Sequence, residues 1–361
     1  MMKSYSETEC LPRVLVTAVG SLPHKDPDAA VDLIMESLPV GPHCPQLSMA
    51  DPREQMWIQC TEGLPRFRVD LQELSYFFDT SGDYTPDVER FYHEYLAVTE
   101  GADPDAFAIG SEYGKGIHAF FSRVQASGKR FPFIKVQVTG PLSFALTVTD
   151  QDKKPIFYDP VFRDVAVKGM GLKAAWLLKT FKPFADKVIV FFDEPSLSAY
   201  GSSAYLGVSK ADVIESLDDV MSMVIDAGGI PGVHCCGNTD WGLLMETSAR
   251  IVNFDGVDFT ESLSIYAQDL MAFLDRGGVL AWGAVPNTAK AAEDSVQLVA
   301  ERIASGIRLL EKVIDRDLLT KKIIVTPACG CAGLSLAHAE AVYGLLSGFH
   351  EKFGGKRFQV T

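Results

Sequence analysis

Residues 228–237 read Gly-Gly-Ile-Pro-Gly-Val-His-Cys-Cys-Gly, a turn followed by a short apolar approach to His234, Cys235 and Cys236. This pattern is typical of a buried strand that carries polar side chains at its C-terminal end. Alternate side chains of a strand share a face, so we expect His234 and Cys236 to point one way and Cys235 the other. Imidazole and thiolate are ligands that zinc prefers. The stretch therefore predicts one half of a metal site.

A second strand of this kind ends in residues 323–331, which read Ile-Ile-Val-Thr-Pro-Ala-Cys-Gly-Cys. We expect the two strand ends to meet around one ion and to leave a position open for a substrate. The expected ligands are His234, Cys236, Cys329 and, as the acidic candidate for the fourth position, Asp255.

A plainer interpretation is a buried core histidine with cysteines that act as small hydrophobic residues. We favour a metal because four of the seven cysteines lie in two short clusters at strand ends. A closed structural zinc site usually has C-x2-C spacings, which are absent, so the pattern indicates an open, catalytic site. If Cys329 is not the third ligand, Cys331 or Cys235 takes its place.

Composition describes an ordinary globular protein of 361 residues, 47% hydrophobic and 22% charged. The net charge of -14 argues against a nucleic-acid or anionic-membrane surface. No apolar run approaches membrane-spanning length, and residues 1–13 lack the apolar segment of a signal peptide. Seven cysteines are an odd number for a disulfide framework, so we expect a reducing, cytoplasmic location.

Short apolar runs alternate with amphipathic segments along the chain, which predicts a (β/α)8 TIM barrel of eight parallel strands buried on both faces. The expected strands are Val14–Val19, Cys44–Leu47, Ile134–Val138, Val188–Phe192, Gly232–Cys235, Ile251–Phe254, Val279–Trp282 and Ile323–Thr326. The expected helices are Asp26–Ser37, Asp164–Thr180, Lys210–Ala227, Ala267–Asp275, Ala291–Ile314 and Ser335–Phe349.

No linker, internal repeat or change of composition divides the chain, so a single domain over residues 1–361 is expected, with its core at about 14–352. Residues 50–117 are rich in loop signals, and we interpret them as an elaborated excursion after the second strand. In such barrels the chemistry lies at the C-terminal ends of the strands, where the unusual residues of this sequence fall. These are Gly20-Ser21, Thr139-Gly140-Pro141, Asp193-Glu194-Pro195, His234–Cys236, Asp255, Trp282-Gly283 and Cys329.

An open zinc site with two thiolates suits sulfur chemistry. The ion holds a further thiol deprotonated at neutral pH, although a free thiol has a pKa of about 8.5. The competing use, activation of water for hydrolysis, usually draws on His and carboxylate ligands with a neighbouring base. A thiol is therefore the expected substrate.

These residues resemble the catalytic C-terminal barrel of cobalamin-independent methionine synthase, within the superfamily that also holds uroporphyrinogen decarboxylase and corrinoid-linked methyltransferases. The resemblance runs in family order from about residue 14 to the C-terminus, without the N-terminal barrel of the full-length enzyme. The matching stretches are Gly20-Ser21-Leu22-Pro23, Thr139-Gly140-Pro141, Asp193-Glu194-Pro195, His234-Cys235-Cys236, the strand that ends at Asp255, and Thr326-Pro327-Ala328-Cys329-Gly330.

The resemblance implies a role for each matched position. The zinc ligands would be those already named, with Asp255 where the family has a glutamate. Gly20 and Ser21 would bind the carboxylate of homocysteine, and Asp193 would pair with its amino group and serve the catalytic site. Thr139 and Gly140 would belong to the same substrate site. The plainer alternatives are a helix start at Gly20-Ser21 and a helix cap at Asp193.

The resemblance also bears on the methyl donor. After the seventh strand the family carries a histidine that protonates the leaving folate, whereas residues 282–287 read Trp-Gly-Ala-Val-Pro-Asn. Methylcobalamin or a corrinoid protein, which needs no such proton, is therefore a donor to set beside methyl-folate. His24 is a candidate replacement acid, although a surface histidine at a helix start is the simpler interpretation.

The expected function is zinc-dependent activation of homocysteine or a related thiol as a zinc thiolate, followed by its methylation to methionine. One alternative is a metal-free enzyme of the uroporphyrinogen decarboxylase type, which needs arginines at the barrel mouth; Arg13 and Arg53 are the early candidates. The other is a non-catalytic partner that binds metal or corrinoid.

Overall fold

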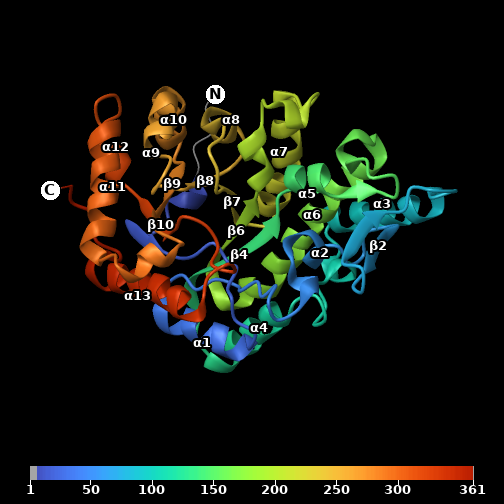
Figure 1. The fold of residues 1–361 in the computed structure, drawn as a ribbon, viewed down its shortest axis with the longest axis horizontal. Coiled ribbons are helices and arrows are strands. Elements are labelled where there is room, and N and C mark those ends of the chain that lie inside the picture. The colour runs from blue at the N-terminus through green and yellow to red at the C-terminus, as the bar shows by residue number, and fades with distance from the viewer. Residues whose placement is uncertain (1–5, 361) are drawn as a thin grey trace.

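The computed structural model describes residues 6–360, and its centre is a curled sheet of seven parallel strands in the order β1-β10-β9-β8-β7-β6-β4 (Figure 1). Seven of the eight predicted strands are present, and their apolar side chains are buried on both faces of the sheet, as expected for parallel strands. They are β1 (Val14–Val16), β4 (Phe131–Thr139), β6 (Ala185–Asp193), β7 (Ile230–Cys235), β8 (Ile251–Phe254), β9 (Val279–Val285) and β10 (Ile323–Pro327).

The segment Cys44–Leu47, predicted as the eighth strand, forms only an isolated parallel bridge, at Gln46, so a full eight-stranded barrel is not shown within residues 6–360. Residues 40–46 nevertheless lie between the two edge strands as an irregular closing segment. On one side, the N–H groups of Phe133 and Lys135 on β4 donate to carbonyls of the segment; on the other, the Gln46 N–H donates to the Gly20 carbonyl. Pro42 and Pro45 lack the N–H groups that a regular ladder needs.

Buried side chains complete the attachment of the closing segment. The Thr17 hydroxyl donates to the Gly41 carbonyl at 2.9 Å, and the Gln137 amide donates to the Cys44 carbonyl at 2.9 Å. His43 Nδ1 lies 3.1 Å from the Cys44 carbonyl, so it carries the proton, and Nε2 accepts from the Tyr343 hydroxyl. Burial lowers the pKa of His43 to about 3. The segment is therefore fixed to both edge strands and to the last helix.

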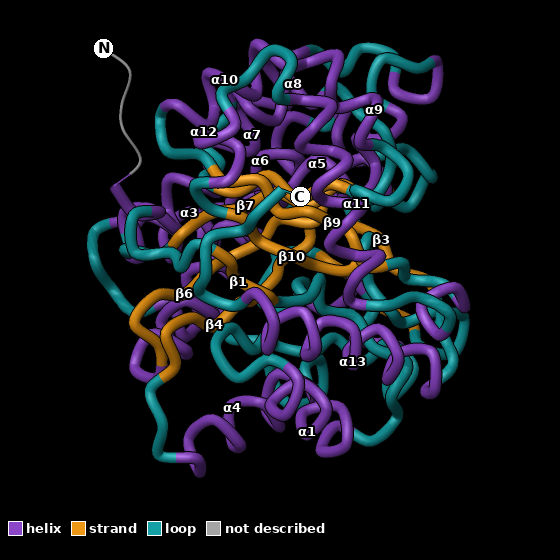
Figure 2. Tube along the Cα trace, turned by 90° about the vertical axis from the view of Figure 1, so that its left-hand side faces the viewer, coloured by secondary structure: helices purple, strands orange, loops and turns teal. Residues whose placement is uncertain are grey.

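Helices cover the outside of the sheet, and Figure 2 shows α1, α4 and α13 on one side of the strands and α7, α8 and α10 on the other. All six predicted helices are present. The one expected at 291–314 begins later because Ser295 caps its first turn by accepting from the Leu298 N–H. The main helices are α1 (Pro27–Ser37), α4 (Lys115–Ser127), α6 (Pro160–Phe181), α7 (Lys210–Asp226), α8 (Trp241–Glu246), α10 (Ala267–Asp275), α11 (Val296–Leu310) and α13 (Leu336–Phe353).

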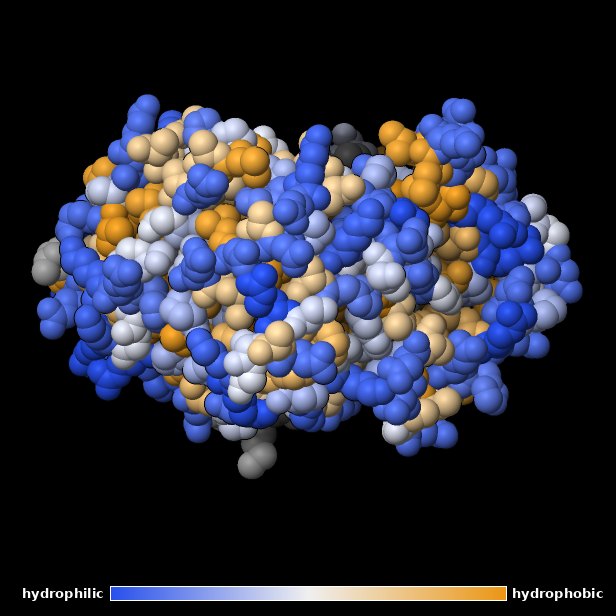
Figure 3. Space-filling view, turned by 90° about the horizontal axis from the view of Figure 1, so that it is seen from below, coloured by the Kyte–Doolittle hydropathy of each residue, from blue (hydrophilic) through white to orange (hydrophobic). Residues whose placement is uncertain are grey.

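Within residues 6–360, no helix combines the length and apolar character needed to cross a bilayer. The face in Figure 3 is mostly hydrophilic, with scattered apolar residues. Single exposed apolar residues of this kind are normal for a folded chain.

The excursion carries small elements of its own at the right-hand edge of Figure 1. Strands β2 and β3 form an antiparallel hairpin that β5 joins in a separate sheet. Lys173 on α6 anchors the excursion, since its buried ammonium donates to the carbonyls of Glu62, Phe107 and Ala108. The single domain over 1–361 stays a prediction. The elements are α2 (Met56–Gln59), β2 (Phe67–Asp70), β3 (Ser75–Phe78), α3 (Thr85–Thr99) and β5 (Thr149–Asp150).

The interior of the curled sheet is layered along the strand direction. An apolar cluster that includes Phe133, Ile189 and Ile251 fills its lower part. Further along the same strands stand the buried polar residues Lys135 and Asn253. Inside the sheet, a polar layer therefore lies below the C-terminal strand ends, and an apolar cluster lies below the polar layer.

We predict that His43 makes the fold sensitive to acid. A depressed folded-state pKa contributes stability that is present above the unfolded value of 6.5 and is lost as the pH falls towards 3. Between pH 6.5 and 5.5 the free energy of unfolding of the wild type should fall by about 1 kcal/mol more than that of His43→Gln. Urea denaturation at both pH values measures this difference; parallel losses in the two proteins would contradict it.

Candidate metal centre

Three side chains meet at the C-terminal end of the curled sheet. His234 lies near the end of β7, Cys236 directly follows that strand, and Cys329 follows β10. Their ligand atoms all lie within 4.8 Å of one another, close enough for the three side chains to hold a single metal ion. The structure thus brings together three of the four residues expected to hold zinc.

The meeting depends on the curl of the sheet, because β8 and β9 separate β7 from β10. Gly283 on β9 permits the close approach of the neighbouring backbones. A Cβ atom there would lie 2.5 Å from the Phe254 carbonyl oxygen and 2.9 Å from the Ala328 Cα. A side chain at this position would push apart the strand ends that carry the ligands.

His234 offers one free ring nitrogen to the cluster. Its Nδ1 lies 2.6 Å from Asn253 Oδ1, whereas its Nε2 is buried and has no hydrogen-bond partner. A buried nitrogen without a partner is costly unless a ligand occupies it. The donor set therefore fits a metal ion that accepts the Nε2 lone pair.

The thiols of Cys236 and Cys329 influence each other's ionisation. Cys329 donates a hydrogen bond to the Cys236 sulfur, which lowers the pKa of Cys236, with a further contribution from His234. The same hydrogen bond raises the pKa of Cys329. Zinc prefers a neutral imidazole and deprotonated thiols, so the tendency of Cys236 to lose its proton also fits zinc.

Asp255, the expected fourth ligand, lies outside this group. It follows β8, and its Oδ1 accepts from the N–H groups of Val257 at 2.8 Å and Asp258 at 3.1 Å. Burial raises the pKa of its carboxyl group. Asp255 also lines a cavity of about 280 Å³ that reaches Ala328, next to Cys329. Asp255 therefore lies near the cluster, and its Oδ1 stabilises the turn after β8 by accepting two N–H groups.

Asp193 ends β6 and is paired in register with His234. Its Oδ1 is buried and has no hydrogen-bond partner. Burial raises the pKa of this carboxyl group, while the charges of Lys135 and His234 act in the opposite direction. Asp193 is therefore an unsatisfied acceptor beside the cluster, suited to a ligand that carries N–H groups.

Two other predicted substrate residues, Thr139 and Gly140, make contacts with the surrounding scaffold. Glu194 accepts from the N–H groups of Leu142 at 2.9 Å and Ser143 at 2.7 Å, at the start of α5 (Pro141–Thr147), so it caps that helix. A Cβ at Gly140 would lie 2.2 Å from Glu194 Cδ, so packing accounts for this glycine. The Thr139 hydroxyl donates to the Met56 carbonyl. Substrate-binding roles for Thr139 and Gly140 stay predictions.

Gly20 and Ser21 lie beside the turn that carries Cys329. Gly20 has φ +146°, and a Cβ there would lie 2.6 Å from Gln137 Cδ. The Ser21 carbonyl accepts from the Cys331 N–H at 2.8 Å, and Ser21 Oγ lies directly against Gly330. Ser21 is therefore next to the centre, as a role in substrate binding requires.

His24 is not the surface residue expected from the sequence. It is buried, and its Nδ1 has no hydrogen-bond partner. Burial lowers the pKa of its ring.

Sequence reasoning missed Lys135 and Asn253. Each stands between apolar neighbours, in Phe-Ile-Lys-Val and Ile-Val-Asn-Phe respectively, and each is fully buried. A charged or amide side chain within a buried parallel strand is the signal that could have found them, because burial without a partner is unfavourable.

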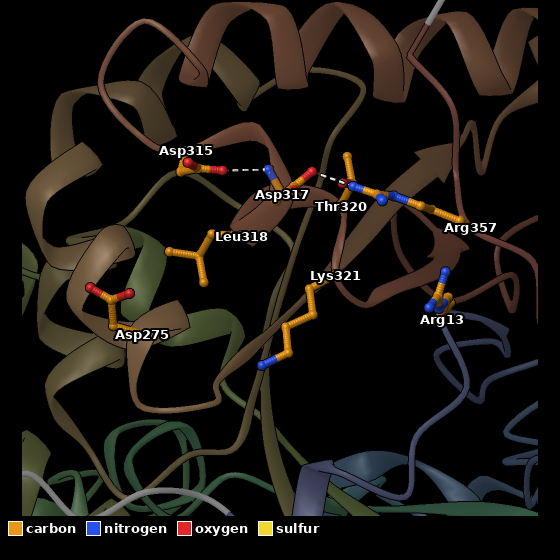
Figure 4. Close-up of a pocket in the computed structure, with 8 residues that line it drawn as sticks. All are labelled: Arg13, Asp275, Asp315, Asp317, Leu318, Thr320, Lys321 and Arg357. Atoms are coloured by element: carbon orange, nitrogen blue, oxygen red, sulfur yellow. Dashed lines mark hydrogen bonds and ion pairs between the residues drawn. The ribbon is translucent and has the colours of Figure 1, made fainter.

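A larger cavity, of about 510 Å³, lies at the opposite end of the strands (Figure 4). It is lined by Arg13 and Lys321, which lie just before β1 and β10, and by the ion pair of Asp317 with Arg357. Its distance from the C-terminal strand ends separates it from the metal centre. Arg53, the other arginine considered for a carboxylate clamp, pairs with Asp51 and Glu112.

Comparison with solved structures confirms the expected resemblance at the level of the fold. A B12-independent methionine synthase from Shewanella sp. W3-18-1, in complex with selenomethionine, is similar with a TM-score of 0.52 and 15% identity, over 93% of this chain and 96% of that one. A methyltransferase from Methanosarcina mazei has a TM-score of 0.44 and 15% identity, over 70% and 69% of the two chains. A GH5_18 protein from Streptomyces cattleya in complex with GlcNAc has a TM-score of 0.40 and 12% identity, over 74% and 75%.

No family model and no curated protein matches the sequence. The curled α/β fold of the Shewanella enzyme is therefore what the comparisons establish for this chain.

We predict that the protein binds about one zinc ion per chain and that Cys329→Ser abolishes binding. Cys331→Ser is the matched control, because Cys331 follows the same strand but lies outside the cluster. Metal analysis of the purified proteins and circular dichroism measure zinc content and retention of the fold. Full zinc content in Cys329→Ser, or its loss in Cys331→Ser, would show that the third ligand is wrongly assigned.

Proposed function

We propose that this protein is a zinc-dependent methyltransferase that methylates the sulfur of homocysteine or a related amino thiol. One observation carries the proposal: a His, Cys and Cys ligand cluster beside an unpartnered, buried carboxylate oxygen. The cluster suits a metal with room for an outside sulfur, and the carboxylate suits the ammonium group of the same substrate.

His234, Cys236 and Cys329 would hold the metal. Zinc, when bound, supplies a positive charge that favours the deprotonated form of an incoming thiol near neutral pH. Two cysteine ligands reduce the acidity of the ion, which favours sulfur chemistry over activation of water. Asp255 borders the site and is a candidate for a further ligand if its second carboxylate oxygen turns towards the cluster.

The remaining groups of the substrate would be held by the chain itself. Asp193 Oδ1, buried and without a partner, would accept from the ammonium group. Gly20 and Ser21, next to the Cys329 turn, would receive the carboxylate through N–H and hydroxyl groups. Holding both ends of the amino acid directs its sulfur towards the metal and lowers the entropic part of the barrier.

The donor would be methylcobalamin, free or on a corrinoid protein, with methyl-folate as the alternative. Residues 282–287 include no histidine that could protonate a leaving folate. The buried His24 lies a few residues beyond Ser21 and is the histidine to consider if folate proves to be the donor.

The alternative of a uroporphyrinogen decarboxylase type finds less support. It needs arginines at the C-terminal mouth, whereas Arg13 lies at the opposite end and Arg53 is paired with two carboxylates. A non-catalytic partner that binds metal or corrinoid would use the same cluster. An assay of turnover distinguishes it from the proposed methyltransferase, because the partner would bind metal without producing methionine.

The test is to incubate the zinc-loaded protein with homocysteine and either methylcobalamin or methyl-folate and to measure methionine. Turnover with one donor, abolished in Cys329→Ser and retained in Cys331→Ser, is the expected result. Bound zinc with no turnover from either donor would instead favour the binding partner, and a protein that never binds zinc would end the proposal.

We predict that Asp193→Asn keeps the zinc but weakens recognition of the ammonium group. Loss of one charged hydrogen bond of about 2 kcal/mol should lower kcat/KM for homocysteine roughly 30-fold. An analogue of homocysteine that lacks the amino group should be methylated at similar rates by the wild type and by Asp193→Asn. Equal losses for the two acceptors would assign Asp193 to the scaffold.

A further inference from the structure

We propose that Asn253 is a positioning residue that fixes the orientation of His234 and ties the two metal-bearing strand ends together. The inference rests on the proposed metal centre but concerns a residue that sequence reasoning overlooked. Asn253 lies on β8, fully buried, between the strand of His234 and the strands that lead to Cys329.

The hydrogen bonds of Asn253 determine which way its amide faces. Nδ2 lies 2.9 Å from the Ala281 carbonyl, and a carbonyl can only accept. The atom that faces Ala281 must therefore be the NH2 group, and the atom that faces His234 must be the oxygen. The alternative orientation would place two oxygens against each other in a buried position.

The orientation of the amide sets the tautomer of the imidazole. Asn253 Oδ1, 2.6 Å from His234 Nδ1, can only accept, so Nδ1 carries the proton. The lone pair then lies on Nε2, which is the nitrogen without a partner. A hydrogen bond of this kind on the far nitrogen holds the ring of a metal-binding histidine and raises its basicity.

The same amide reaches the second half of the centre. Its Nδ2 also donates to the hydroxyl of Thr326 at 2.9 Å, and Thr326 is a buried residue of β10 shortly before Cys329. A single side chain thus links the histidine on β7 with the strand that presents the cysteine. These hydrogen bonds fix the spacing between His234 and the strand that leads to Cys329, directly below the candidate metal site.

Asn253 also donates to the Ala281 carbonyl, so it could matter only for the stability of the fold. The variants must therefore separate the bond to His234 from the bond to Ala281. Asn253→Asp separates the two roles: its carboxylate still accepts from His234 Nδ1 but cannot donate to Ala281. Asn253→Ala removes both interactions. Thr326→Val is a matched control that removes only the link to β10 and leaves the bond to His234.

The experiment measures zinc affinity of the full-length protein by competition with a chelator, and the stability of the metal-free protein by urea denaturation. Asn253→Ala should lose about 10- to 100-fold in zinc affinity. Asn253→Asp should stay within a few-fold of the wild type, although its metal-free form is destabilised. Thr326→Val should fall between the two.

An equal loss of zinc affinity in Asn253→Asp and Asn253→Ala would overturn the proposal, since the acceptor would then not matter. If Asn253→Ala does not fold, the nitrogen chemical shifts of His234 in the zinc-loaded wild type decide instead. A protonated Nδ1 with zinc on Nε2 is expected, and zinc on Nδ1 would overturn the proposal.

Neither readout needs turnover. Zinc binding in the expected order, without methyl transfer from either donor, would overturn the proposed function and leave the role of Asn253 intact. A wild type that binds no zinc would overturn both.

Discussion

The curl of the parallel sheet is the constraint on which the candidate site depends. Strands β7 and β10 are three positions apart in the sheet, which in a flat sheet would separate them by roughly 14 Å. Their inward side chains would then point in parallel directions and never meet. Because the sheet curls, His234 and Cys329 face each other across its interior, within 4.8 Å at their ligand atoms. The irregular closing segment, residues 40–46, keeps the curl by bonding to both edge strands.

The curled sheet buries the side chains on its inner face, so polar groups placed there without partners are unfavourable. His234 Nε2 and Asp193 Oδ1 are both buried without partners, each at a cost of about 1–3 kcal/mol relative to a satisfied group. Lys135 lies in the layer below, where its ammonium donates to Gln137 Oε1 at 3.1 Å and its charge partly offsets the burial of Asp193. The fold tolerates this cost at one end of the sheet, above an apolar cluster that contributes stability. Unsatisfied atoms concentrated in that way are expected where ligands bind.

How far the sequence predicts this structure depends on which physical effect dominates at each position. Apolar runs located seven strands because burial on both faces demands continuous hydrophobicity. The segment Cys44–Leu47 forms no regular strand because Pro42 and Pro45 cannot donate to a ladder, although the segment still occupies the place of a strand. Residue type and position at strand ends predicted that His234, Cys236 and Cys329 lie together, and the structure brings them together. The partners of those ligands were not predicted, since the bond between His234 and Asn253 depends on register between strands.

Register between strands also determines which contacts the glycines and acidic residues at the strand ends make. Gly140 and Glu194 follow adjacent strands, and they pack together at the start of α5, where Glu194 accepts from the Leu142 N–H. Asp193, one residue before Glu194, points elsewhere because successive side chains of a strand alternate. One carboxylate therefore caps a helix, while its neighbour remains free beside the cluster.

A shared fold does not establish a shared reaction, so the function has to be argued from the residues of the site. A similarity of 15% identity to a methionine synthase establishes the curled α/β scaffold, which hosts many reactions. The donor set supports the proposed sulfur chemistry over hydrolysis, because a metal held by two cysteines and one histidine would bind sulfur readily and polarise water weakly. Three candidate ligands from two distant strand ends, with an unpartnered carboxylate oxygen beside them, would leave a position open, unlike the closed tetrahedral shell of a structural zinc. An open ligand position together with a free acceptor is what the proposed amino thiol substrate would need, which is why the proposal rests on the site and not on the fold.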